Sequence, residues 1–167
     1  FANLIGAIDF DVREEIQSLY EQLMGTTSDL PEITANGFMR LKMHDGTIYS
    51  RPLPDEFLKL IGINNPSGIL TGGKKSDVLF GGSDKDILIG HGGGDLLIGG
   101  AGADDYFVNS GDIIDDSDKQ GRIFDGYSFK QYTGGTYDKD RGCYLSDGNG
   151  WYKMEGDDLI INGNIRV

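Results

Sequence analysis

The chain has 167 residues, a formal net charge of -12 and an isoelectric point near 4.4. This excess of acidic residues disfavours nucleic acid and anionic membranes as partners and suits divalent cations. Its 27 glycines follow no three-residue period, which excludes collagen, and 38% hydrophobic content argues against plain disorder. Cys143 is the only cysteine, so no internal disulfide can form, and no apolar stretch is long enough to predict a transmembrane segment.

Residues 1–66 are predicted to form an N-terminal α+β segment, which could be the end of an upstream domain. Its signals are apolar residues at helical spacing behind a capping pair, and two β-patterned runs on either side of His44-Asp45-Gly46. A third run is opened by a proline and closed by a glycine. The predicted elements are a helix over Asp11–Met24, a hairpin of Phe38–Met43 and Thr47–Arg51, and a short helix over Asp55–Ile61.

Residues 67–118 hold a repeat of nine residues. Each unit starts with glycine, carries aspartate at its sixth place and has a large apolar residue two places later. The four units are Gly72–Phe80, Gly81–Ile89, Gly90–Ile98 and Gly99–Phe107, and their aspartates are Asp77, Asp86, Asp95 and Asp104. A glycine-rich turn before a three-residue strand predicts a solenoid in which two units form one coil and alternate units stack in parallel. Asp77 would then lie near Asp95, and Asp86 near Asp104.

Stacked turns of this kind would offer carboxylates and main-chain carbonyl oxygens to a cation. Calcium takes six to eight such oxygens at roughly 2.3–2.6 Å, and four turns would hold about two or three ions. Carboxylates brought together without a cation repel one another, so metal binding and folding should be one event and the calcium-free tract should be unfolded. Besides the four aspartates, the candidate metal-site residues are Gly72, Gly81, Gly90, Gly99, Lys74, Ser83, Gly92, Ala101, Asp112 and Asp115.

The repeat resembles the RTX nonapeptide, GGxGxDxUx, of the calcium-binding parallel β-roll in exported bacterial toxins, lipases and proteases. The segments Ile114–Asp118 and Thr133–Thr136 also resemble the tail that leads from such repeats into a β-rich cap. The resemblance implies Ca²⁺ as the ligand, an extracellular location reached by type I secretion of the parent protein, and folding on calcium binding outside the cell. An upstream catalytic domain of the parent chain would be a further partner.

The four units differ in how closely they match the RTX pattern. Lys75 and Asp84 stand in units one and two where the pattern has its third glycine, and His91 replaces the second glycine of unit three. A non-glycine residue in left-handed geometry costs about 1–2 kcal/mol. We therefore expect the roll to be best ordered at its C-terminal end, near Asp95 and Asp104.

Residues 119–167 are predicted to form an antiparallel β cap, because short β-patterned runs alternate with Asp-Gly and Asn-Gly turns. The predicted strands are Arg122–Phe124, Cys143–Leu145, Trp151–Met154, Leu159–Ile161 and Ile165–Val167. The predicted fold class is therefore mainly β, with a short parallel β-roll between an N-terminal α+β segment and this cap. Because the chain begins at Phe1, we interpret it as a piece of a longer protein.

Other interpretations of the same residues stay open. The repeated aspartates could be simple turn formers, the solenoid could be metal-free, and the acidic run Asp112–Asp118 could be a solvated loop. In an enzymatic alternative the chain is a fragment of an RTX hydrolase or self-processing toxin, with His44 and Cys143 as the candidate pair. In another alternative the aromatic residues of the cap bind a carbohydrate or a protein.

Overall fold

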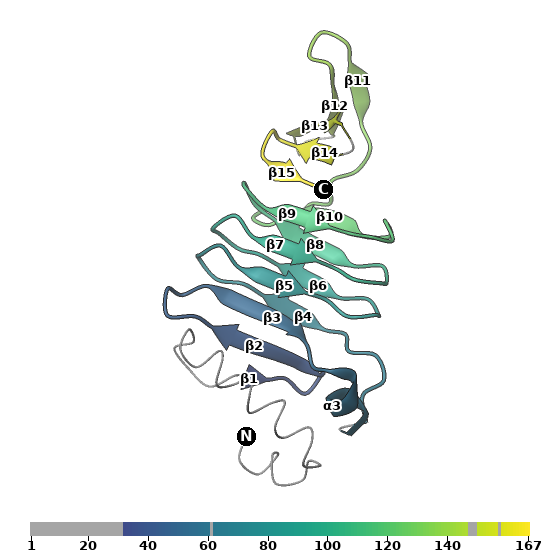
Figure 1. Cartoon of the computed structure of the whole chain (residues 1–167). Helices are drawn as coiled ribbons and strands as arrows, with labels where there is room; N and C mark the ends of the chain where they lie inside the picture. The colour runs from purple at the N-terminus through teal and green to yellow at the C-terminus, as the bar shows by residue number, and fades with distance from the viewer. Residues whose placement is uncertain (1–31, 61, 147–149, 157) are drawn as a thin grey trace.

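The computed structural model describes residues 32–60, 62–146, 150–156 and 158–167, so the predicted helix Asp11–Met24 lies outside the described residues. The described part is mainly β, as predicted, and is organised as a parallel β-roll with a smaller β unit at its C-terminal end (Figure 1). Before the repeats come β1 (Glu32–Ile33), β2 (Phe38–Lys42), β3 (Ile48–Pro52) and the short helix α3 (Asp55–Leu60). The roll contains β4 (Ile69–Thr71), β5 (Val78–Phe80), β6 (Ile87–Ile89), β7 (Leu96–Ile98), β8 (Asp105–Val108), β9 (Ile113–Asp115) and β10 (Arg122–Asp125). The C-terminal strands are β11 (Thr136–Asp138), β12 (Cys143–Ser146), β13 (Gly150–Glu155), β14 (Asp158–Ile161) and β15 (Ile165–Arg166).

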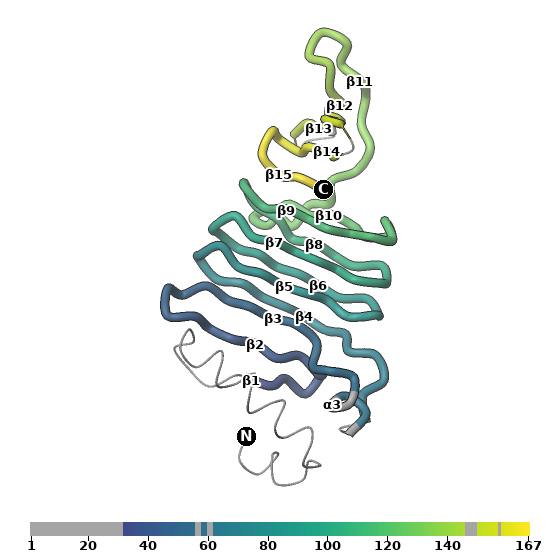
Figure 2. The backbone as a smooth tube through the Cα atoms, in the orientation of Figure 1, coloured from purple at the N-terminus to yellow at the C-terminus, as the bar shows by residue number. Residues whose placement is uncertain are grey.

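Two parallel sheets face each other across the roll. One sheet has the order β10-β8-β6-β4, and the other runs through β3, β5, β7 and β9 (Figure 2). The stacking is in register, since Leu79 pairs with Leu97 and Leu88 pairs with Tyr106. Alternate units therefore lie side by side in parallel, which confirms the coil predicted from the repeat.

The middle residue of each short strand supplies the core. In β5, β6 and β7 the central side chain is buried and its two neighbours are only partly buried. This alternation follows from the two-residue period of a strand, whose successive side chains point to opposite faces of the sheet. The stacked core residues are Leu70, Leu79, Leu88, Leu97 and Tyr106, each at most 3% exposed.

The predicted hairpin and short helix before the repeats are both present. β2 pairs with β3 in antiparallel fashion, and β3 then pairs in parallel with β5 through Tyr49 and Val78. The hairpin therefore continues one sheet of the roll beyond the first repeat. It covers the end of the core, because Phe38 and Ile48 belong to the same buried cluster as Leu79.

One predicted strand of the cap belongs to the roll instead. The run predicted as Arg122–Phe124 is β10, and it pairs in parallel with β8 rather than in an antiparallel cap. The Arg122 guanidinium donates to both carboxylate oxygens of the buried Asp105, at 2.7 and 2.8 Å. This bidentate pair aligns the strand with the coil below it. The prediction was wrong because this segment lacks the nine-residue pattern.

The other four predicted cap strands are present and antiparallel, as predicted, and β11 is an additional strand that was not predicted. β11, β12, β13 and β14 form an antiparallel series, and β15 pairs with β14 in the same way. β15 also pairs in parallel with β9 through Arg166 and Ile113. The cap is therefore hydrogen-bonded to the last coil.

Replacing Leu88 with alanine should destabilise the roll strongly. Leu88 is fully buried in the leucine stack, so the change leaves a cavity that costs about 2–5 kcal/mol. The matched control is Ile69→Ala on the neighbouring strand β4, where the side chain is 67% exposed. Urea unfolding in calcium-containing buffer measures both variants. Equal losses of stability in the two would contradict this core.

Candidate metal centre

Buried aspartates form two rows, one along each turn edge of the roll. Asp77, Asp95 and Asp112 make one row, and Asp86 and Asp104 make the other. None of the five is more than 1% exposed. Burying a carboxylate is costly unless its oxygens find partners, so the partners of each oxygen define what these rows can do.

The Oδ1 oxygens join successive coils. Asp95 Oδ1 accepts a hydrogen bond from the main-chain N–H of Asp77 at 2.9 Å, and Asp112 Oδ1 accepts one from Asp95 at 2.9 Å. On the other edge, Asp104 Oδ1 accepts one from Asp86 at 2.7 Å. Each carboxylate therefore satisfies a main-chain donor of the coil before it. This arrangement confirms the predicted proximity of Asp77 to Asp95 and of Asp86 to Asp104.

The Oδ2 oxygens divide the turns into two kinds. Asp77 Oδ2 accepts the N–H of Gly73, and Asp86 Oδ2 accepts the N–H of Gly82, both at 2.5 Å. In contrast, Asp95 Oδ2 and Asp104 Oδ2 are buried and have no hydrogen-bond partner in the described part of the chain. The first two turns thus satisfy their own carboxylates, whereas the third and fourth each leave one carboxylate oxygen for another partner.

The backbone of the turns accounts for this division. At the second place, His91 and Gly100 have φ of 67° and 94°, and at the fourth place Gly93 and Gly102 have φ of 135° and 117°. Among the described residues, no member of the first two turns has a positive φ. Their fourth places hold Lys75 and Asp84, side chains that disfavour the left-handed region.

The first-place glycines leave room around the carboxylates. A Cβ on Gly90 would lie 2.4 Å from Asp95 Oδ2 and 3.1 Å from Asp112 Oδ2. A Cβ on Gly99 would lie 1.9 Å from the Tyr106 hydroxyl oxygen and 2.3 Å from Asp104 Oδ2. Oxygen atoms, most of them from carboxylates, therefore crowd the space that any side chain at these positions would fill. Hard oxygen donors of this kind suit Ca²⁺.

The other first-place glycines bring main-chain oxygens to the same kind of space. A Cβ on Gly72 would lie 2.6 Å from the carbonyl oxygen of Gly90, and one on Gly81 would lie 2.1 Å from that of Gly99. The carbonyls of the third and fourth turns therefore face the first and second turns, on the side where Asp77 Oδ2 and Asp86 Oδ2 lie.

The third-place residues take part only through the main chain. The Lys74, Ser83 and Ala101 side chains are exposed. The N–H groups of Gly92 and Ala101 donate to carbonyl oxygens of the turns stacked against them, both at 3.2 Å. The exposed side chains at the third place therefore lie away from the buried aspartate rows.

The two candidate aspartates at the exit differ in position. Asp112 is buried and ends its row, so it takes the place that a further repeat would fill. Asp115 is exposed at the end of β9 and does not join either row.

Sequence reasoning missed two acidic residues beside Asp104. Asp118 accepts the N–H of Gly102, and Asp116 accepts the N–H of Gly121, both at 2.8 Å. A Cβ on Gly121 would lie 2.3 Å from Asp116 Oδ2, so this carboxylate fills the position of the side chain that glycine lacks. The signal was the acidic run after β9, which by itself is also typical of a solvated loop.

Burial shifts the titration of the rows. Burial, together with the nearby carboxylates of Asp112 and Asp77, raises the pKa of Asp95 to about 7. Burial likewise raises the pKa of Asp104 to about 6, together with the charges of Asp86 and other acidic neighbours. Near neutral pH without a cation, ionising these two groups therefore opposes folding.

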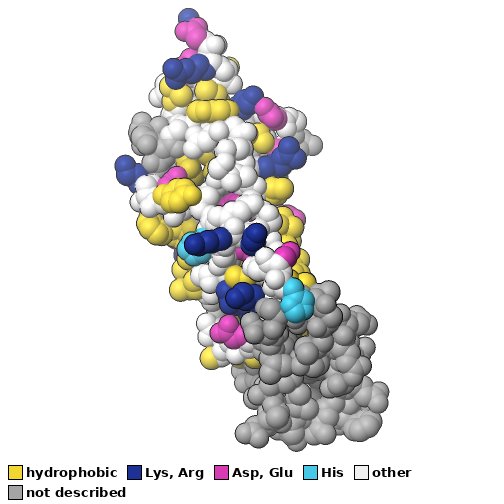
Figure 3. Space-filling view, turned by 90° about the vertical axis from the view of Figure 1, so that its left-hand side faces the viewer, with side chains coloured by type: hydrophobic (Ala, Val, Ile, Leu, Met, Phe, Trp, Pro, Cys, Tyr) yellow, Lys and Arg dark blue, Asp and Glu magenta, His cyan; other side chains and the backbone are white. Residues whose placement is uncertain are grey.

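The described residues contain no group of three or more His, Cys, Asp or Glu side chains that could hold a metal ion by themselves. A cation at the turns would thus depend on main-chain oxygens as well as carboxylates. The face shown in Figure 3 has scattered acidic and basic side chains and no continuous acidic patch.

Comparison with known proteins assigns this chain to no family. No family model, no curated protein and no solved structure matches this chain. Among the residues that the structure describes, no helix has the length and apolar character needed to cross a membrane.

Replacing Gly90 with alanine should reduce both stability and cation binding. The new methyl group would meet Asp95 Oδ2 at 2.4 Å, so the carboxylate or the turn must shift. We expect a loss of more than about 1 kcal/mol, because overpacking a closed space costs about 1–3 kcal/mol. Gly92→Ala in the same turn is the matched control, since its Cβ would meet nothing within 4 Å. Urea unfolding and calcium titration of both variants test the prediction, which fails if they behave alike.

The metal-free protein should be more stable in mild acid than at neutral pH. The folded pKa values of Asp95 and Asp104, about 7 and about 6, lie above the unfolded value of about 3.9. Their protonated forms therefore stabilise the fold below about pH 4, and this contribution is lost as the pH rises through about 6 and about 7. Circular dichroism in chelator across this range measures the effect, as β structure that is gained when the pH falls from about 7 to about 4. In the variant Asp95→Asn the decline should be smaller; a stability that rises with pH would overturn the assignment.

Proposed function

We propose that this chain is the calcium-binding module of a larger exported protein, of the RTX type that its repeats resemble. One calcium ion binds at the third turn and one at the fourth, giving about two ions per chain. Asp95 and Asp104 supply the charged ligands, and carbonyl oxygens of the stacked turns complete the coordination. Asp77 and Asp86 hold the first coils together without a metal.

The observation that carries this proposal is the pair of buried, unpartnered Oδ2 oxygens. A buried carboxylate oxygen without a hydrogen bond is costly, and a cation is the partner that removes both the missing bond and the charge. Both oxygens occur in the turns whose fourth place is glycine. The metal-free solenoid, an alternative from the sequence, accounts for the first two turns but leaves Asp95 and Asp104 unsatisfied.

Calcium then acts as a folding signal. Extracellular modules bind calcium with dissociation constants of about 10⁻⁴–10⁻³ M, above the level in a cell interior. The tract would stay unfolded inside the producing cell and could pass through a secretion channel. Outside, calcium would neutralise the aspartate rows, form the coils and give the cap a surface on which to fold.

A second candidate function is supported by the aromatic residues of the cap. Tyr137, Tyr144 and Tyr152 lie directly opposite one another on β11, β12 and β13. Their neighbouring ring centres are 5.2 and 5.6 Å apart, and Tyr137 and Tyr144 are 55% and 44% exposed. Such a row favours a carbohydrate- or protein-binding role for the cap alongside the calcium module.

The described residues give the enzymatic alternative no Cys–His pair. His44 lies in the turn between β2 and β3, whereas the buried Cys143 lies in β12, beyond the opposite end of the roll (Figure 1). The catalytic hypothesis therefore depends on residues other than this pair.

Calcium titration of the full chain tests the proposed function. Calorimetry should give about two ions, and circular dichroism in excess chelator should show a loss of β structure that calcium restores and magnesium does not. Asp95→Asn and Asp104→Asn should each remove one ion or weaken it at least about tenfold, a change of about 1.4 kcal/mol. The exposed carboxylate variant Asp140→Asn is the control. Full β structure without calcium would contradict calcium-dependent folding, and the absence of calcium binding would contradict the proposed function.

A further inference from the structure

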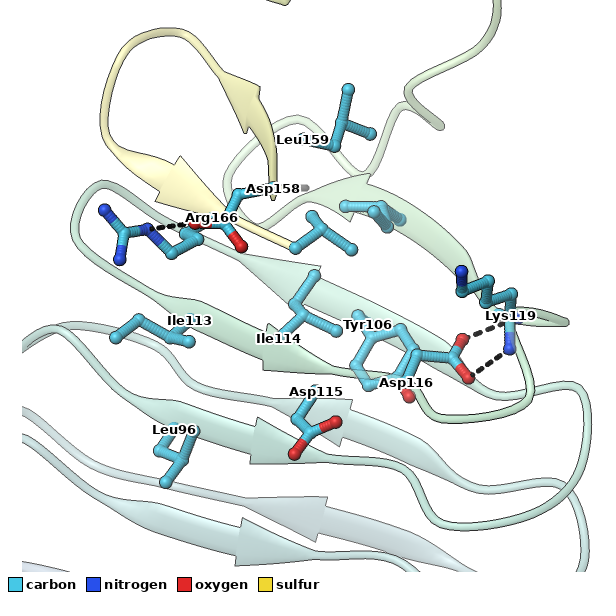
Figure 4. A pocket seen from close by; sticks show the side chains of 13 residues that line it. Leu96, Tyr106, Ile113, Ile114, Asp115, Asp116, Lys119, Asp158, Leu159 and Arg166 are labelled. Carbon is cyan, nitrogen blue, oxygen red and sulfur yellow. Dashed lines mark hydrogen bonds and ion pairs between the residues drawn. The ribbon is translucent and has the colours of Figure 1, made fainter. Parts of the chain in front are cut away.

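A cavity of about 580 Å³ lies between the last coil of the roll and the cap (Figure 4). This volume falls within the range of about 300–1,000 Å³ that is usual for small-molecule sites. Strands β7, β8, β9 and β10 contribute one side, and β14 with β15 contributes the other. The apolar lining is Leu96, Ile113, Ile114, Ile123, Leu159 and Val167.

The ring of Tyr106 forms part of the roll side of the cavity, and Figure 4 shows it between Ile114 and Asp116. Its hydroxyl is buried at the fourth turn instead, where a Cβ on Gly99 would meet both this hydroxyl and Asp104 Oδ2. Tyr106 therefore adds an aromatic surface to the cavity and no polar group.

The charges of the cavity are unequal on its two sides. On the cap side Arg166 pairs with Asp158 at 3.3 Å, so these two charges offset each other. On the roll side Asp116 is held by main-chain N–H groups, which leave its negative charge in place. Asp115 has no ion pair in the described part of the chain, and Lys119 is the remaining cation of the lining.

The sum of these charges favours a positive ligand. Three aspartates and two basic residues line the cavity, which leaves one negative charge, and the chain as a whole carries -12. An anion would approach against this field, and a neutral molecule would gain nothing from it. A cation near Asp115 gains an attraction that the cap side does not cancel.

We propose that this cavity binds a small amphipathic organic cation. Its apolar body packs against Ile113, Ile123 and Leu159, and its ammonium or amidinium group lies beside Asp115. This binding is separate from the calcium sites, because the Asp115 carboxylate belongs to neither aspartate row.

The test uses the full chain in calcium-containing buffer and three probes with the same phenyl body. Phenethylammonium, phenylethanol and phenylpropionate differ chiefly in head-group charge, and calorimetry or NMR titration gives their affinities. Phenethylammonium should bind most tightly. Asp115→Asn should weaken it about threefold to tenfold, as expected for losing one partly exposed charge pair, without changing phenylethanol binding. Asp140→Asn, far along the cap in the loop after β11, should leave all three unchanged.

A filled cavity provides the second variant. Ile123→Trp should abolish binding of all three probes while circular dichroism shows the same β content. Tighter binding of phenylpropionate, equal binding of all three probes, or no effect of Asp115→Asn would overturn the proposal. Absence of any binding to a folded chain would overturn it as well.

Discussion

The structure depends on one interaction, the hydrogen bond from a main-chain N–H to a buried aspartate carboxylate in the coil stacked on it. Short strands of three residues offer few ladder hydrogen bonds, so the turns must also be tied to one another. Asp95 and Asp104 provide those ties at 2.9 and 2.7 Å. The cost is a line of buried negative charges, whose repulsion and desolvation oppose the folding that the same groups direct.

The chain meets this cost in two ways. In the first two turns a glycine N–H closes onto the second carboxylate oxygen, so the charge is held by hydrogen bonds alone. In the last two turns left-handed residues at the second and fourth places accompany an open oxygen. One substitution per unit, Lys75 or Asp84 for glycine, accounts for the difference at the fourth place, because a side chain disfavours the left-handed backbone. The turns with glycine at that place are the ones that a cation would complete.

The repeat predicted the roll because every unit has its turn glycines, its aspartate and its core residue at fixed places. The two-residue spacing of Asp86 and Leu88 predicted that Asp86 lies in an aspartate row and Leu88 in the core, and the nine-residue period predicted how the units stack.

β10 had no such signal, since its position depends on the contact of Arg122 with Asp105, a pair distant in the sequence. Asp116 was missed for a related reason. Its carboxylate replaces a side chain that Gly121 lacks, and only the path of the loop brings the two together. The antiparallel character of the cap was predictable from its turns, but neither β11 nor the short parallel pairing of β15 with β9 was.

That pairing connects the aspartate row to the cap. Asp112 ends the row through its carboxylate, and its carbonyl oxygen accepts the N–H of Arg166 from β15 at 3.1 Å. Next to it, Gly111 donates to the carbonyl of Asn164 at 3.0 Å. The residue that completes the third turn is therefore also the residue on which the cap is aligned. A cation that fixes the Asp95 and Asp112 carboxylates would fix this docking edge at the same time, whereas repulsion between them would loosen it. On this argument the cap needs no calcium ligand of its own to depend on calcium, because its first hydrogen bonds to the roll are made by the last member of the row.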